Sequence, residues 1–191
     1  TMNCFESTLR LRNTDPANPY LVHLRLDFLL QERLGNKLPY GWRRRAHPSV
    51  PTDSLIYLRT ATPLNLPGEQ RHELALKPGD VVMANVDLCV PVTVSSGDSN
   101  KKRHVPLTDE NLPHVLARHC EKNGLHLQSH AASPQYREHY GKKGQRFFLC
   151  CNPLSLIAEV QDVALTEQAI VYGIGLKRVF GYGLLSDLEV L

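Results

Sequence analysis

Apolar and polar positions alternate over several short segments in the first half of the chain. Such alternation is typical of strands with one buried face. It predicts strands within residues 2–12, 40–46, 54–60 and 71–77. After the first of these segments, apolar residues recur at helical spacing and predict a helix from Pro19 to about Arg33. Asn18 can cap this helix, Pro19 suits its first position, and Gly35 is a good stop.

The second half repeats this order of elements. The pattern predicts a strand at 81–94, a helix at about 108–123, extended segments at about 126–139 and 145–160, a helix at 163–172 and a strand at 183–190. In the first half, Pro63 and Pro67 allow at most a short second helix. Both halves therefore have the order β-α-β-β-α-β. We expect an α+β protein of two tandem ferredoxin-like (RRM-like) domains, 1–78 and 79–191, divided at the turn KPGD.

The bulk composition restricts the class of protein. The chain has 191 residues, 42% of them hydrophobic and 21% charged, as in an ordinary folded domain pair. No apolar run approaches the roughly 20 residues of a membrane-spanning helix, so we expect no membrane partner. Five cysteines without a CxxC pair predict free thiols in a reducing cytoplasm. The histidines show no paired-ligand spacing for zinc.

A glycine-rich stretch, GIGLKRVFGYGLL, occupies residues 173–185. Its glycines are Gly173, Gly175, Gly181 and Gly183. Nucleotide-binding loops of this composition connect a strand to a helix within a βαβ unit. This loop instead follows the last predicted helix and leads into the last predicted strand. We therefore expect no nucleotide pocket here.

Tyr20, His23 and Asp27 share one face of the predicted first helix, since they stand at i, i+3 and i+7. A histidine exchanges protons near neutral pH, with an unperturbed pKa of about 6.5. Tyr20, one turn earlier, can orient a phosphate or form a hydrogen bond to the histidine. The alternative is a surface histidine on an amphipathic helix, and the pattern alone leaves both interpretations open.

Cations gather in four places in or near predicted loops. The clusters are Arg43, Arg44 and Arg45; Lys101, Lys102 and Arg103; Lys142, Lys143 and Arg146; and Lys177 with Arg178. Contacts from lysine and arginine to phosphate dominate nucleic-acid affinity. Any single cluster is typical of solvated loop charge. Composition leaves a shared RNA surface and ordinary loop charge equally open.

Four motifs, found in order along nearly the whole chain, resemble the RAMP superfamily of CRISPR RNA proteins. More narrowly, the chain resembles the CasE-like RNA-processing endonucleases of type I-E Cascade, or a relative from another CRISPR type such as type IV. NPYLVH (18–23) is similar to that family's first-helix motif, and KKRHVPL (101–107) to a segment of its second half. SPQY (133–136) with GKKG (141–144) resembles its stem-binding hairpin, and GIGLKRVFGYGLLS (173–186) its glycine loop.

The resemblance implies a metal-independent endoribonuclease that cuts CRISPR repeat RNA at the base of a stem-loop. The ribose 2′-OH would attack the phosphate, leaving a 2′,3′-cyclic phosphate and a 5′-OH, and no carboxylate cluster for two magnesium ions is apparent in the sequence. His23 is the implied proton acceptor or donor, Tyr20 would orient the 2′-OH or phosphate, and Lys142 or Lys143 is the candidate cation. Asp27 either tunes His23 or is a solvated acid, and we expect the latter.

The implied partners are the repeat stem-loop, as precursor and as mature guide RNA, and other subunits of a CRISPR effector complex. No metal and no cofactor are implied. The expected RNA-binding residues are the four cation clusters, the four loop glycines and Arg137. One alternative is a non-catalytic RAMP-type subunit that binds guide RNA as a scaffold. Another is a general single-strand RNA-binding protein, but QRFFLCC (145–151) lacks the glycines of an RNA-recognition motif.

Overall fold

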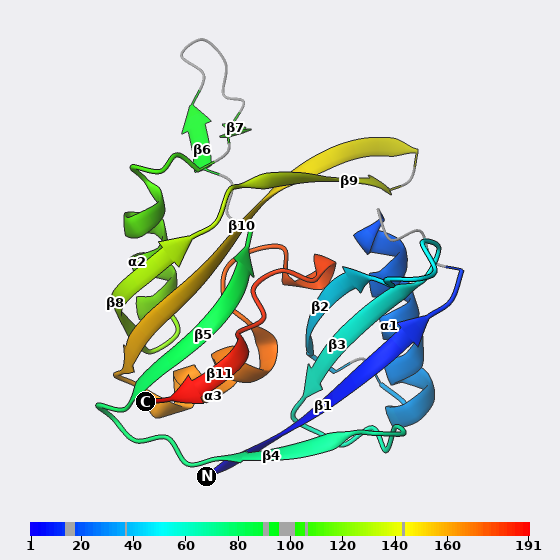
Figure 1. Cartoon of the computed structure of the whole chain (residues 1–191), viewed down its shortest axis with the longest axis horizontal. Helices are drawn as coiled ribbons and strands as arrows, with labels where there is room; N and C mark the ends of the chain where they lie inside the picture. Colours follow the sequence, from blue (N-terminus) through cyan, green and yellow to red (C-terminus); the bar gives the residue numbers. More distant parts are fainter. Residues whose placement is uncertain (14–17, 37, 90–91, 96–101, 106, 143) are drawn as a thin grey trace.

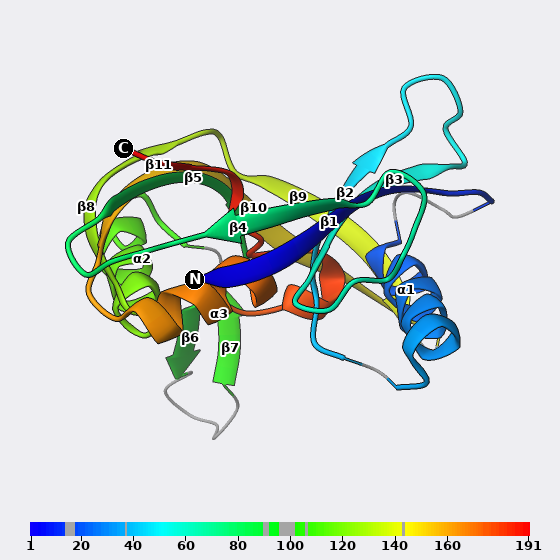
Figure 2. The same ribbon diagram turned by 90° about the horizontal axis from the view of Figure 1, so that it is seen from below.

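The computed structural model describes residues 1–13, 18–36, 38–89, 92–95, 102–105, 107–142 and 144–191 (Figure 1). In chain order the elements are β1 (Met2–Leu11), α1 (Pro19–Leu34), β2 (Gly41–Ala46), β3 (Ser54–Thr60), β4 (Gln70–Leu74), β5 (Val81–Leu88), β6 (Val92–Ser95), β7 (Lys102–Val105), α2 (Leu112–Glu121), β8 (Leu125–Ala132), β9 (Tyr136–Lys142), β10 (Gln145–Val160), α3 (Val163–Tyr172), the 3-10 turn η1 (Arg178–Phe180) and β11 (Ser186–Val190). The strands form two larger sheets, and the three α-helices lie on one side of them (Figures 1 and 2).

The first sheet is antiparallel and has the strand order β2-β3-β1-β4. Helix α1 packs on one of its faces, because one stripe of the helix is apolar. The core between them is formed by Val22, Leu26, Leu30, Trp42, Ile56 and Leu58. Burying one such leucine stabilises the fold by about 1.5–3 kcal/mol. This packing fixes the rotation of α1 about its axis, so that the residues outside the apolar stripe do not pack on the sheet.

Helix α1 has the bounds that the sequence predicted to within one residue. Pro19 stands in its first turn, and Gly35 ends it in the left-handed region at φ 73°. The side chain of Asn18 makes no capping hydrogen bond, contrary to expectation. The segment expected to hold a short second helix is irregular, and there Leu64 and Leu66 are buried in the core instead.

The second sheet has the strand order β11-β5-β10-β8, with α2 and α3 beneath it. Its core includes Leu88, Leu116, Leu156, Ile170 and Leu185, all almost fully buried. Strand β10 is long enough to serve two pairings, with β5 and β8 along one part and with β9 along the other. The β9–β10 arm therefore extends beyond the sheet and passes over to the α1 side of the molecule (Figure 1).

Both halves share one topology. The fourth, first, third and second strands of each half follow one another across its sheet, which is the ferredoxin-like order. The expected α+β fold with tandem ferredoxin-like halves is thus confirmed. The expected division at 78/79 lies in the connection between β4 and β5.

Three predicted elements differ from the structure. The strand expected at 81–94 ends at Leu88, and Val92–Ser95 pairs instead with β7 in a separate hairpin. The extended segment at 126–139 is divided into β8 and β9, because Pro134 cannot donate to a ladder. Helix α2 begins at Leu112 and not at 108, with Pro113 in its first turn.

The two halves are tied together by two arginines of the first sheet, the buried Arg59 and the half-buried Arg43. Arg59, which is 5% exposed, forms an ion pair with Glu6 and donates to the carbonyls of Ile170 and Leu185 at 2.6 and 2.8 Å. Arg43 donates to Ser186 Oγ at 2.8 Å and pairs with Asp87 across 3.2 Å. A guanidinium offers several donors in a fixed arrangement, so its charge-assisted hydrogen bonds to carbonyl groups hold the two halves in one relative position.

The five cysteines are free, as the sequence predicted. Burial raises the pKa of Cys89, Cys120 and Cys151 to about 12 each, so these thiols stay protonated near neutral pH. Within the described ranges, no helix is both long and apolar enough to span a membrane.

Candidate active site

His23 lies on α1 beside the buried stripe of Val22, Leu26 and Leu30, on the face that it shares with Tyr20 and Asp27, as the helical spacing predicted. Its side chain is 19% exposed, so it is neither a core residue nor a fully solvated one. Tyr20 is partly buried one turn earlier, and Asp27 follows one turn later with 18% of its side chain exposed. The structure therefore brings all three onto one half-buried surface, and a catalytic role for His23 stays a prediction.

A residue that the sequence did not single out joins this surface. Tyr40, just before β2, places its hydroxyl 3.0 Å from His23 Nδ1 and donates to Asp27 Oδ1 at 2.9 Å. His23 Nε2 lies 3.5 Å from Asp27 Oδ2. Asp27 is thus a partner of both residues, and the expectation that it is a solvated acid is wrong.

The environment of Tyr40 keeps its phenol neutral. Burial and then the hydrogen bond to Asp27 raise the pKa of Tyr40 well above its usual value. A neutral phenol has one proton to donate and an oxygen that still accepts. The hydroxyl can therefore serve Asp27 and His23 together.

Aromatic rings connect this surface to the opposite end of the chain. The centroids of the Tyr20 and His23 rings are 6.4 Å apart, and the ring of Phe180 in η1 also lies 6.4 Å from that of Tyr20. Tyr140 of β9 packs on Phe180 at 4.9 Å. These centroid distances are those of interacting aromatic pairs. The glycine loop and the β9–β10 arm thus both reach the face of α1 that carries His23.

The glycine loop is held by close backbone contacts. Gly183 has φ 85°, and a Cβ there would lie 2.0 Å from the carbonyl oxygen of Ile174. Ile174 in turn donates its N–H to Gly183 at 2.8 Å. A Cβ at Gly181 would meet the buried ring of Trp42 at 3.1 Å. These two glycines are needed for packing, and a role in RNA binding for Gly173, Gly175, Gly181 and Gly183 stays a prediction.

The predicted cations are distributed unevenly. Lys177 and Arg178 are exposed on the glycine loop, and Arg137 is exposed on β9, where its guanidinium lies 4.9 Å above the ring of Phe148. Lys101 and Lys143 lie outside the described residues. For Lys102, Arg103, Lys142 and Arg146 the structure describes the backbone, which belongs to β7, β9 and β10.

The arginines of β2 differ from the others in their surroundings. Arg44 is paired with Glu138 of β9 at 2.7 Å, and the hydroxyl of the buried Tyr182 donates to the same carboxylate. Arg43 pairs with Asp87, as described above. Arg45 is exposed and lines a polar cleft of about 380 Å³ between the first sheet and β11. Arg43 and Arg44 therefore join the two halves, and their contact with RNA stays a prediction.

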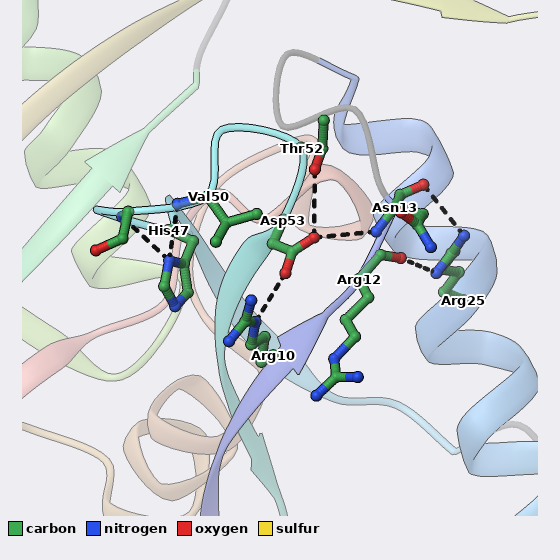
Figure 3. Close-up of polar contacts among 9 residues, drawn as sticks. Arg10, Arg12, Asn13, Arg25, His47, Val50, Thr52 and Asp53 are labelled. Carbon is green, nitrogen blue, oxygen red and sulfur yellow. Dashed lines mark hydrogen bonds and ion pairs between the residues drawn. The ribbon is translucent and has the colours of Figure 1, made fainter.

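The end of β1 is held by a separate polar cluster (Figure 3). Asp53 accepts from Arg10 Nε at 2.7 Å and from the backbone N–H of Asn13 at 3.1 Å. The hydrogen bond from Arg10 is the main reason that the pKa of Asp53 is lowered. Arg25 of α1 donates to the carbonyls of Arg12 and Asn13. Asp53 and Arg25 together fix β1 against the helix that carries His23.

Among the described residues, no group of three or more histidine, cysteine, aspartate or glutamate side chains could hold a metal ion. A histidine ring in this setting can transfer protons, and the side chains of Tyr20 and Tyr40 lie near it. Sequence reasoning singled out Tyr20 and His23, but not the neighbours Tyr40, Phe180 and Tyr140 that the structure brings to them. Tyr40 is 17 residues from His23, and no local spacing relates the two.

Comparisons with known proteins find the same fold in solved structures. No family model and no curated protein matches the sequence. The CRISPR-associated protein Cas6e from Escherichia coli str. K-12 has a TM-score of 0.74 at 17% identity, with 100% of both chains covered. Thermus thermophilus Cse3 bound to an RNA representing a pre-cleavage complex has a TM-score of 0.71 at 16% identity, again with 100% of both chains.

A chain of a CRISPR RNA-guided surveillance complex has a TM-score of 0.67 at 18% identity, covering 98% of this chain and 100% of that one. At these identities the likeness shows a shared fold. The resemblance to CasE-like proteins that the motifs predicted is thus supported by the three-dimensional fold over the whole chain.

Proposed function

We propose that this chain is an endoribonuclease that cleaves a CRISPR repeat RNA at the base of a stem-loop. The observation that carries the proposal is the position of His23. It lies half-buried on α1 beside Tyr20 and Tyr40, and Tyr20 in turn contacts the aromatic rings of the glycine loop and the β9–β10 arm. A titratable ring held in this way beside two RNA-binding candidates is suited to act on a bound phosphodiester.

The solved structures with this fold support RNA as the substrate. One is Cse3 bound to 19 nt RNA, and another represents a pre-cleavage complex. By analogy, the partners of this chain are the repeat stem-loop and the guide RNA made from it. The chains of surveillance complexes with the same fold suggest that it remains on its product as a subunit of such an assembly.

The proposed reaction needs no metal ion. The ribose 2′-oxygen attacks the adjacent phosphorus, and the bond from phosphorus to the 5′-oxygen breaks. The products are a 2′,3′-cyclic phosphate and a 5′-OH. His23 takes the proton of the 2′-OH or gives one to the leaving 5′-oxygen. Tyr20 orients the 2′-OH or the phosphate, so that attack is in line.

Negative charge builds on the phosphorane oxygens during this reaction, and a cation close to them lowers the barrier. We assign this role to Lys142 or Lys143 at the tip of the β9–β10 arm. Arg137, near the base of the same arm, and Lys177 and Arg178 of the glycine loop would bind the backbone of the stem.

The test uses purified protein and a panel of CRISPR repeat stem-loops in EDTA. We expect tight binding of one repeat and cutting at the base of its stem, with cyclic phosphate and 5′-OH ends. A 2′-deoxy sugar just 5′ of the cut should block the reaction. Cutting of that RNA would contradict the 2′-OH mechanism, and a strict need for Mg²⁺ would indicate another nuclease class. Tight binding without cutting would favour the non-catalytic scaffold role.

A further inference from the structure

The hydroxyl of Tyr40 lies between His23 and Asp27, at 3.0 Å from Nδ1 and 2.9 Å from Oδ1. We propose that Tyr40 is a positioning residue that fixes the proton of the neutral His23 ring on Nδ1. Nε2 is then the nitrogen that exchanges a proton with the substrate. The tautomer is inferred from the hydrogen bond that Tyr40 donates to Asp27, and its catalytic consequence rests on the proposed function.

The number of available protons decides the tautomer. An ionised carboxylate accepts only, so the contact between Tyr40 and Asp27 needs the phenol proton. The phenol has no second proton for His23. The 3.0 Å contact with Nδ1 is therefore a hydrogen bond only if Nδ1–H donates to the phenol oxygen. With the proton on Nε2, Nδ1 and the phenol oxygen would face each other as two acceptors.

The raised pKa of Tyr40 supports this order of donors. Because burial and Asp27 disfavour the phenolate, the phenol keeps its proton throughout the neutral range. The bond between Tyr40 and Asp27 is thus present whenever Asp27 is ionised. Each hydrogen bond in the chain from His23 through Tyr40 to Asp27 points in the same direction, and such chains strengthen one another.

The position of Tyr40 is itself well determined. It is followed by Gly41, where a Cβ would lie 2.5 Å from the carbonyl oxygen of Val171 in α3. The next residue, Trp42, is 1% exposed in the core beneath α1. Both neighbours anchor the start of β2, so the phenol meets the helix at a fixed place.

The carboxylate of Asp27 also stabilises the protonated, cationic ring of His23. When Nε2 takes the proton of the ribose 2′-OH, both ring nitrogens carry hydrogen and the ring becomes cationic. Asp27 Oδ2, at 3.5 Å from Nε2, then lies opposite that charge. Asp27 would therefore fix the tautomer through Tyr40 and stabilise the imidazolium directly, which are the two tasks of an orienting carboxylate.

The tautomer can be measured without any RNA. Long-range 1H–15N correlations of the imidazole rings distinguish Nδ1–H from Nε2–H, and loss of one ring's signals in His23→Ala identifies His23. We expect the neutral His23 ring to carry its proton on Nδ1 in the wild type and to shift toward Nε2–H in Tyr40→Phe. An Nε2–H ring in the wild type would overturn the proposal.

The catalytic half is tested by single-turnover cleavage. Tyr40→Phe keeps the ring and removes both hydrogen bonds, so we expect a rate loss on the order of tenfold or more. The dissociation constant for a 2′-deoxy substrate should not change. Tyr57→Phe, which removes an exposed hydroxyl from β3, is the matched control and should cut at the wild-type rate.

An unchanged rate in Tyr40→Phe beside an altered tautomer would overturn the positioning role. If the wild-type protein cut no repeat at all, the proposed function would fail. The tautomer of His23 would still decide whether Tyr40 orients the ring.

Discussion

The ring of Phe180 lies 6.4 Å from the ring of Tyr20, although the two residues come from opposite ends of the chain. The ring of Tyr140 also packs on Phe180, with 4.9 Å between the centroids. Helix α1, the glycine loop and the β9–β10 arm thus meet at one aromatic cluster. Phe180 connects the segment expected to hold the RNA stem with the segment expected to cut it.

Replacement of Phe180 by alanine should separate binding from cleavage. Without the ring, Tyr20 loses a neighbour that limits its orientation, and misplacement of an orienting group lowers the rate. We expect a single-turnover rate reduced on the order of tenfold, with RNA affinity changed much less. Val179→Ala removes an exposed side chain from the same turn and should have no effect. Equal rates in both variants would show that the aromatic contact is unimportant.

Gly183→Ala should destabilise the fold through a steric clash. The added Cβ would lie 2.0 Å from the carbonyl oxygen of Ile174, so the last strand has to shift. Overpacking of this kind costs about 1–3 kcal/mol of unfolding free energy. Chemical denaturation measures the loss.

Gly79→Ala is the matched control for that variant. Its φ is 91°, close to the 85° of Gly183, but nothing lies within 4 Å of an added Cβ. It therefore includes the backbone cost of a positive φ without the clash. If both variants lost the same stability, the close contact in the glycine loop would contribute nothing.

Asp53 predicts a dependence of stability on pH. The pKa of its carboxyl is lowered in the folded state, mainly by Arg10, so it binds protons more weakly than in the unfolded chain. Its contribution to stability is therefore complete above about pH 5 and is lost as the pH falls below its unfolded pKa of about 3.9.

Asp53→Asn should lack this dependence. We expect the difference in unfolding free energy between wild type and variant to be constant from about pH 5 to 7 and to shrink below about pH 4. Denaturant unfolding at a series of pH values measures it. A difference independent of pH down to 3 would show that the Arg10 pair does not stabilise the fold.

The elements that follow a local pattern could be predicted from the sequence. Helix α1 has a regular apolar stripe and a glycine stop, and α3 has the predicted bounds. The strand at 81–94 was predicted too long, because the apolar pattern of the sequence continues from β5 into β6. In that case the local pattern does not tell which strand pairs with which.

The same limit applies to the candidate site. Tyr20, His23 and Asp27 could be grouped from helical spacing alone. Tyr40 and Phe180 reach them only through the packing of β2 under α1 and of the glycine loop against both. The arginine run of β2 was expected to bind RNA. In the structure Arg43 also faces Asp87, and Arg44 faces Glu138. These carboxylates belong to the other half of the chain, so the sequence around the arginines does not reveal the contacts.

The central claim is that His23 carries the proton transfer of RNA cleavage. Removing its imidazole leaves no general acid or base at that position, and such groups typically contribute 10²- to 10⁴-fold to a rate. Binding should persist, since the phosphate contacts are assigned to lysines and arginines elsewhere.

The most direct measurement is the single-turnover cleavage rate of His23→Ala in EDTA on the repeat RNA that the wild type binds, with the dissociation constant measured alongside. His126→Ala, an exposed histidine on β8, is the matched control. We predict a rate at least about 100-fold below wild type for His23→Ala, with near-normal affinity, and a wild-type rate for His126→Ala. Cleavage by His23→Ala at the wild-type rate would contradict the assignment.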